Sequence, residues 1–68
     1  MEKIKISTEY IKLSQVLKLA NLVESGAEAK FLINDGKVKV NNKVELKRGK
    51  KILKGDIIEF GGKIIQVD

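Results

Sequence analysis

The sequence contains no cysteine and no histidine. Without cysteine, neither a disulfide framework nor a thiolate metal site can hold the fold together. Without histidine, the chain also lacks the commonest metal ligand and the usual general base at neutral pH. We therefore expect no metal, no cofactor, no small-molecule substrate and no catalytic residue, and we predict that the protein is not an enzyme.

Long apolar segments are missing as well. No run of the sequence approaches the roughly 20 apolar residues that a membrane span needs, and the first residues, MEKIKIS, lack the apolar stretch of a signal peptide. We expect a cytoplasmic protein without membrane contact. A chain of 68 residues predicts one domain, spanning 1–68, whose stability comes from aliphatic packing.

Aromatic residues and arginine are scarce. The chain has one tyrosine, two phenylalanines, no tryptophan and a single arginine, whereas proteins that read base edges use arginine, asparagine or stacking rings. We interpret Phe31 and Phe60 as core residues and leave the role of Tyr10 open. This composition favours recognition of shape and backbone charge over the reading of a single-stranded sequence.

Lysine, in contrast, is abundant. The formal net charge is +5, and Glu45 is the only acid between Lys37 and Lys54. Clustered cations of this kind neutralise phosphates and release counterions, which favours a nucleic acid as the partner. The alternative is a solvated strand face whose lysines block aggregation at a sheet edge. We prefer that alternative for other lysines, namely Lys3, Lys5 and Lys63.

Two short helices are predicted by local patterns. Residues 12–20 carry apolar side chains at i, i+3, i+4 and i+7, and Asn21 can end this helix in a left-handed conformation. Ser25 and Glu28 fit a capping box, and Gly36 supplies the positive φ that the exit of the second helix requires. The pair forms a helix-turn-helix-like corner.

The remaining segments alternate with a period of two, which is typical of strands. Residues 1–7 predict a half-buried strand, and Val38 and Val40 predict a strand with Lys37 and Lys39 on its outer face. The Asn41–Asn42 pair predicts a turn into a return strand that includes Val44 and Leu46. The last segments predict a basic loop at 47–51, a turn near Asp56 and a hairpin formed by 57–60 and 64–67 around Gly61–Gly62.

The chain resembles the S4 RNA-binding domain in a series of residues that occur in the family's order. The series comprises Lys12–Leu17, Ser25–Lys30, Ile33, Gly36, Val38, Val40–Asn41 and Gly55–Asp56. The likeness covers about residues 10–60 and is greatest to the small stand-alone S4 proteins of bacteria. It implies an α+β fold in which the two helices pack on a small, curved, mostly antiparallel sheet, the S4-like (αL) arrangement.

The resemblance also implies an RNA surface formed by the two helices and the strand that follows them. Lys12 and Lys30 take the places of family arginines that face RNA, and Lys37, Lys39 and Asn41 take the strand and turn places. Three departures stand out: Ser14 replaces the usual Asp, Gly26 the usual Arg and Asn42 the usual Gly. A helix N-terminus with a free glycine amide can still bind a phosphate.

We therefore predict non-catalytic binding of structured RNA by a monomer, with ribosomal RNA during ribosome assembly or rescue as the implied target. The predicted RNA-binding residues are Lys12, Lys18, Gly26, Lys30, Lys37, Lys39, Asn41, Lys43, Lys47, Arg48, Lys50 and Lys51. Two alternatives stay open. One is a protein-interaction module that binds an acidic protein. The other is a DNA-binding domain, although the second helix carries few long polar side chains for reading a major groove.

Overall fold

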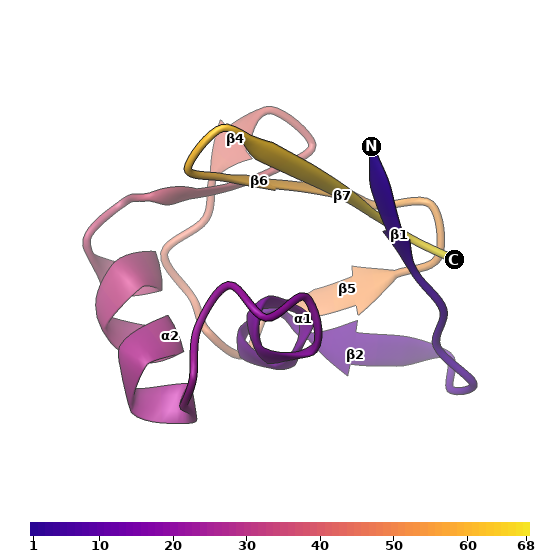
Figure 1. The fold of residues 1–68 in the computed structure, drawn as a ribbon, viewed down its shortest axis with the longest axis horizontal. Helices are drawn as coiled ribbons and strands as arrows, with labels where there is room; N and C mark the ends of the chain where they lie inside the picture. The colour runs from indigo at the N-terminus through magenta and orange to yellow at the C-terminus, as the bar shows by residue number, and fades with distance from the viewer.

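The computed structural model describes residues 1–68. The chain forms two helices and seven short strands, and the helices lie against one face of the main sheet (Figure 1), which confirms the predicted α+β arrangement. In chain order the elements are β1 (Glu2–Ile4), β2 (Tyr10–Lys12), α1 (Leu13–Leu19), α2 (Gly26–Asn34), β3 (Val38–Val40), β4 (Lys43–Val44), β5 (Lys51–Leu53), β6 (Ile57–Phe60) and β7 (Lys63–Val67). Neither helix has the length and apolar character that a membrane crossing requires.

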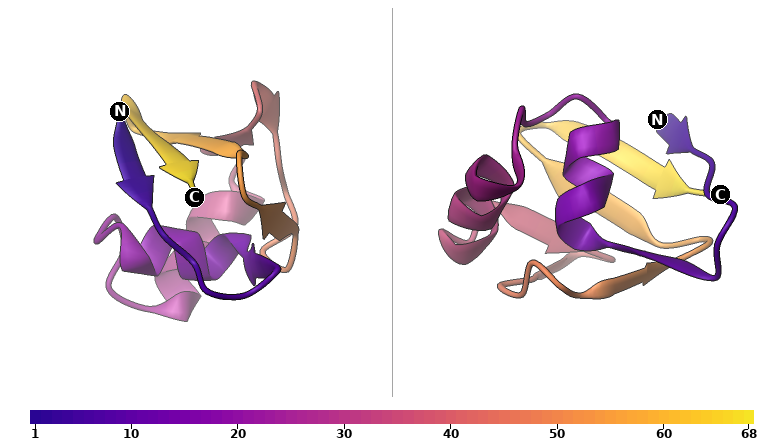
Figure 2. Two further views of the ribbon diagram at one scale, coloured as in Figure 1. Left: turned by 90° about the vertical axis from the view of Figure 1, so that its right-hand side faces the viewer. Right: turned by 90° about the horizontal axis from the view of Figure 1, so that it is seen from below.

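The main sheet has five strands in the order β1-β7-β6-β3-β4. Only the β1–β7 pair is parallel, so the prediction of a mostly antiparallel sheet is confirmed. The strands β2 and β5 form a separate antiparallel ribbon. Figure 2 shows that this ribbon and the helices lie on the same side of the main sheet.

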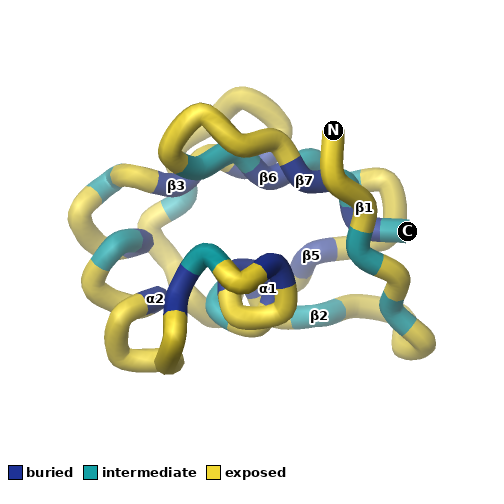
Figure 3. The backbone as a smooth tube through the Cα atoms, in the orientation of Figure 1, coloured by how far each residue is buried: buried dark blue, intermediate teal, exposed yellow.

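The core lies between these two layers (Figure 3). All 13 buried residues are apolar, and they come from both helices and the segment that connects them, from the main sheet and from the ribbon. Within β3, Val38 and Val40 are buried and Lys39 is exposed, as the alternation of the sequence predicts. Helices of seven and nine residues are too short to be stable alone, so this burial holds them in place.

Both helices end in the same hydrogen-bonded motif. Asn21 adopts a φ of 59° after α1, and the amide of Leu22 donates to the carbonyl of Leu17 at 3.0 Å. Gly36 adopts a φ of 77° after α2, and the amide of Lys37 donates to the carbonyl of Leu32 at 3.2 Å. These six-to-one bonds are those of a Schellman motif, and the predicted left-handed helix ends are confirmed.

The start of α2 differs from the prediction in one bond. The Ser25 hydroxyl accepts from the amide of Glu28 at 3.1 Å, as a capping box requires. The Glu28 carboxylate, however, accepts from the amide of Glu24 at 2.7 Å, one residue earlier than the Ser25 amide of a standard box. Glu28 therefore anchors the loop that leads into the helix.

Two hairpins turn through pairs of residues with positive φ. Asn41 and Asn42 have φ values of 50° and 71°, and Gly61 and Gly62 have values of 58° and 81°. Two consecutive positive φ values match the twist of the strands that such a turn connects. Both predicted turns are confirmed, but the return strand β4 ends at Val44, and Leu46 lies exposed beyond it.

Two sequence-based interpretations are wrong. Phe31 was expected in the core, but its side chain is 69% exposed, because the inward face of α2 consists of Ala29 and Ile33 and Phe31 falls on the other side. Residues 51–53 were interpreted as the end of a loop and the approach to a turn, whereas they form β5. Phe60 packs against the core as expected.

Candidate nucleic-acid interface

The β2–β5 ribbon presents lysine and tyrosine side chains on one exposed face. Tyr10 pairs with Leu53 and Lys12 pairs with Lys51, so these four side chains share a face of the ribbon. Ile52, between Lys51 and Leu53, is fully buried and anchors the opposite face in the core. The ribbon thereby holds two lysines beside an aromatic ring at the protein surface.

The tyrosine ring is in contact with one of these lysines. The Lys51 Nζ atom lies 4.8 Å from the centroid of the Tyr10 ring. A cation at this distance over an aromatic face is attracted by the ring's quadrupole, by about 0.5–1 kcal/mol at an exposed site. The contact restrains the ring and the ammonium group relative to each other.

The basic loop of residues 47–50 is fastened to the first turn of α1. The amide of Leu13 donates to the carbonyl of Lys50 at 3.0 Å, and the amide of Ser14 donates to the carbonyl of Arg48 at 3.1 Å. The first amides of a helix have no partner within the helix, so the loop supplies the missing acceptors. This places the backbone of Arg48 and Lys50 next to the Lys12–Lys51 pair, and we call Lys12, Arg48, Lys50 and Lys51 the ribbon cluster.

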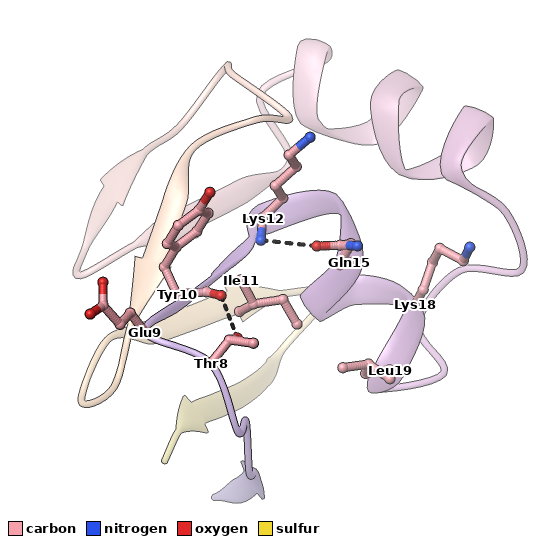
Figure 4. A pocket seen from close by; sticks show the side chains of 8 residues that line it. All are labelled: Thr8, Glu9, Tyr10, Ile11, Lys12, Gln15, Lys18 and Leu19. Carbon is pink, nitrogen blue, oxygen red and sulfur yellow. Dashed lines mark hydrogen bonds between the residues drawn. The ribbon is translucent and has the colours of Figure 1, made fainter.

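A groove runs between β2 and the exposed side of α1 (Figure 4). Its volume is about 700 Å³, and we call it the β2–α1 groove. Lys12 and Lys18 contribute cations to it, and Glu9 is the one acid among the lining residues. The lining residues are Thr8, Glu9, Tyr10, Ile11, Lys12, Gln15, Lys18 and Leu19.

The α2 helix carries two further predicted residues. Lys30 lies on the exposed side of the helix, where it borders a hollow together with Phe31 and Asn34. Gly26 is the first helical residue, and a Cβ atom added to it would meet nothing within 4 Å. The family's usual arginine therefore has room at this position.

Three predicted residues lie apart from the ribbon cluster. Lys39 projects from the face of the main sheet that points away from the helices, since its neighbours Val38 and Val40 face the core. Lys37 forms an exposed ion pair with Asp35, with 3.8 Å between Nζ and Oδ2. Lys43 lies on β4, the edge strand of the sheet. The structure thus divides the predicted basic residues between the helix side and the sheet side.

The predicted RNA contact of Asn41 competes with a structural role. Its Oδ1 atom accepts from the amide of Ile57 at 3.0 Å, and its Nδ2 atom donates to Asp56 at 3.1 Å. The Asp56 carboxylate also accepts from the amide of Leu53 at 2.8 Å. The side chain of Asn41 therefore ties the β3–β4 turn to the β5–β6 turn, and the turn role expected of Asp56 is confirmed.

The sequence left one feature of this site unassigned, which is the pairing of Tyr10 with the basic segment. In both strands an isoleucine lies between two exposed residues, but three residues are too few for the period of two to stand out. The partner strands are also far apart in the chain, so no turn signal connects them. Only the tertiary structure shows that Tyr10 and Lys51 are neighbours.

Comparison with known proteins gives a consistent result. The S4 domain family matches residues 4–68. RlbA of Bacillus subtilis (strain 168), a probable ribosome maturation protein, is 42% identical over 59 residues, which cover 87% of this chain and 83% of RlbA. YbcJ of Escherichia coli (strain K12), a putative RNA-binding protein, is 41% identical over 58 residues, covering 85% of this chain and 83% of YbcJ.

A solved structure shows the same fold. The solution structure of YbcJ from E. coli, described as revealing an αL motif involved in RNA binding, superposes with a TM-score of 0.75. The superposition covers 98% of this chain and 86% of YbcJ at 37% sequence identity. The protein therefore belongs to the S4 domain family, and it is similar to the small stand-alone members RlbA and YbcJ over most of their lengths.

Proposed function

We propose that the protein binds structured RNA without catalysing a reaction, and that its target is ribosomal RNA during ribosome maturation or rescue in the cytoplasm. The ribbon cluster is the observation that carries this proposal. Its four cationic residues lie on neighbouring stretches of backbone and are all exposed, and the chain's only ion pair is the one between Lys37 and Asp35. The charges of the ribbon cluster are therefore free to neutralise phosphates.

The relatives support the same proposal. YbcJ is named a putative RNA-binding protein, and RlbA is named a probable ribosome maturation protein. The chain belongs to the S4 domain family, and it has the same fold as YbcJ, with two helices packed on a small sheet. Ribosomal RNA as the specific target rests on the name of RlbA together with the cationic surface.

The cluster favours structured RNA over a single strand. Sequence readers of single strands splay the bases over several aromatic rings, and here only Tyr10 accompanies the cluster. The longest dimension of the molecule is 27 Å, so one face can contact only a few phosphates. We expect moderate affinity that falls steeply as the salt concentration rises.

A competition experiment tests the class of partner. The protein is titrated with an RNA hairpin and with a DNA hairpin of the same sequence, at salt concentrations from 50 to 200 mM. We expect tighter binding to the RNA and a linear fall of log affinity with log salt. Equal affinity for the two hairpins would contradict RNA as the target.

Cell-based crosslinking tests the ribosomal target. RNA crosslinked to the protein is sequenced, and the protein's sedimentation is followed on a gradient before and after RNase treatment. Ribosomal RNA should dominate the crosslinked sequences, and RNase should release the protein from the ribosomal fractions. Continued co-sedimentation after RNA digestion, without crosslinks to ribosomal RNA, would favour the alternative of an acidic protein partner.

A further inference from the structure

We propose that the β2–α1 groove receives one unpaired nucleotide of the bound RNA, with its base stacked on Tyr10. This inference rests on the proposed function and narrows it, because it specifies an RNA helix interrupted by a bulged or looped-out base. A base inside a regular duplex is paired and stacked, so it cannot enter a groove on the protein surface. Four features of the groove lead to this assignment.

The first feature is size combined with apolar surface. A volume of about 700 Å³ falls within the range of roughly 300–1,000 Å³ that is typical of small-molecule sites. Tyr10 and Ile11 line the groove from β2, and Leu19, an exposed leucine, lines it from α1. A base has two apolar faces, and such walls can cover them.

The second feature is the tyrosine ring. Tyr10 is 40% exposed, and Lys51 lies over its ring at 4.8 Å. The ammonium covers one face of the ring, which leaves the other face available for a base. Stacking of a base on an aromatic side chain tolerates any of the four bases, since each has a π face.

The third feature is a hydrogen-bond donor within the groove. The Gln15 Oε1 atom accepts from the amide of Lys12 at 3.2 Å, which fixes the side-chain amide at the start of α1 (Figure 4). Its Nε2 atom has no partner within the chain, so it can donate to an acceptor on a base edge. The hydroxyl of Thr8, in contrast, already donates to the carbonyl of Tyr10 at 2.7 Å.

The fourth feature is the placement of the two lysines in the groove. Lys12 and Lys18 are six residues apart, which separates them by about 9 Å along the helix axis. They therefore stand at opposite ends of α1 and can contact the phosphates on either side of one inserted nucleotide. Glu9, at the Tyr10 end, carries the only negative charge of the groove and disfavours a phosphate there.

Phe31 is the other candidate ring, and it is more exposed than Tyr10. The hollow beside it is smaller, at about 310 Å³, and Asp35 lines it together with Lys30. Because Lys30 is the only cation there and Asp35 repels phosphate, the charge does not favour RNA as clearly as in the β2–α1 groove. Phe31 therefore serves as the comparison in the experiment.

The experiment uses two RNA hairpins with identical stems, one fully paired and one with a single bulged 2-aminopurine. We expect the wild-type protein to bind the bulged hairpin about tenfold more tightly and to quench the 2-aminopurine fluorescence by stacking. Tyr10→Phe should keep this preference. Tyr10→Leu should lose the preference and the quenching and still bind both hairpins in a salt-dependent way, because the charges of the ribbon cluster remain. Phe31→Leu should behave as the wild type.

The outcomes separate the inference from the proposed function. Equal, salt-dependent binding of both hairpins by the wild type would overturn the inference and leave the proposed function standing. Loss of the preference in Phe31→Leu but not in Tyr10→Leu would overturn the assignment to Tyr10. Failure to bind either hairpin would contradict the proposed function itself. If Tyr10→Leu does not fold, the wild type and Phe31→Leu still test the inference, because absence of the preference and of the protein-dependent quenching in the wild type would overturn it.

Discussion

At the residue scale, Asn41 and Asn42 adopt similar backbone conformations and have different roles. Both have positive φ values, which asparagine tolerates better than most residues. Only Asn41 uses its side chain within the fold, where it bonds to Ile57 and Asp56. Family resemblance alone would treat both as turn residues, and the structure distinguishes them.

This difference predicts opposite effects of the same substitution. Asn42→Gly relieves the positive φ without losing a hydrogen bond, so it should raise the free energy of unfolding by about 0.5 kcal/mol. Asn41→Gly loses two hydrogen bonds and should lower the free energy of unfolding by about 1–2 kcal/mol. Urea denaturation measures both values. A loss in Asn41→Gly no greater than any loss in Asn42→Gly would show that the side-chain bonds of Asn41 do not stabilise the fold.

Gly26 offers a second test at this scale. It has no positive φ, and open space surrounds its missing Cβ, so a larger residue should fit without strain. If α2 faces RNA, Gly26→Arg should increase the affinity for a structured RNA severalfold. It should also steepen the fall of log affinity with log salt concentration, which we call the salt slope, by about one.

Gly26→Gln is the matched control, since it adds a long polar side chain without the charge. It should leave the salt slope unchanged. If the two variants bind RNA with equal affinity and equal salt dependence, the start of α2 lies outside the RNA surface. The binding assay is the same salt titration in both cases.

At the element scale, the helices and the ribbon differ in how far the sequence predicts them. The helices are specified locally: the apolar period identifies α1, and Ser25, Glu28 and Gly36 mark the ends of α2. The ribbon depends on pairing between Tyr10–Lys12 and Lys51–Leu53, two segments far apart in the chain. No local pattern in three residues specifies such a pair, because it forms only when both isoleucines are buried against the same core.

The helix ends provide the prediction for this scale. Gly36 has a φ of 77°, and an L-residue in this region costs about 1–2 kcal/mol. Gly36→Ala should therefore lower the free energy of unfolding by about that amount, measured by thermal or urea denaturation. Space is not the cause, since the nearest atom to an added Cβ is a Val44 methyl at 3.9 Å.

Gly49→Ala is the control for that variant. Gly49 lies in the basic loop with no positive φ, and nothing lies within 4 Å of an added Cβ. Its substitution should change the free energy of unfolding by less than about 0.5 kcal/mol. A loss equal to that of Gly36→Ala would mean that the left-handed helix end is not the source of the effect.

At the scale of the whole molecule, the predicted basic residues lie on two different sides rather than on one continuous surface. The ribbon cluster lies with the helices, and Lys39 lies on the far face of the main sheet. The sequence predicted these residues as a single set because charge along a chain does not reveal which layer each residue joins. The central claim is that RNA binds on the ribbon side.

The most direct test compares two double variants that remove the same charge from different places. Lys12→Gln with Lys51→Gln removes two of the four positive charges of the ribbon cluster, and Lys3→Gln with Lys63→Gln removes one positive charge each from β1 and β7 of the main sheet. The affinity for a fully paired RNA hairpin is measured from 50 to 200 mM salt. The ribbon variant should make the salt slope shallower by about two and weaken binding about tenfold at 0.1 M salt. The sheet variant should keep an affinity and a salt slope close to those of the wild type. Equal losses in the two variants would show that only net charge matters and would contradict a defined RNA surface on the ribbon side.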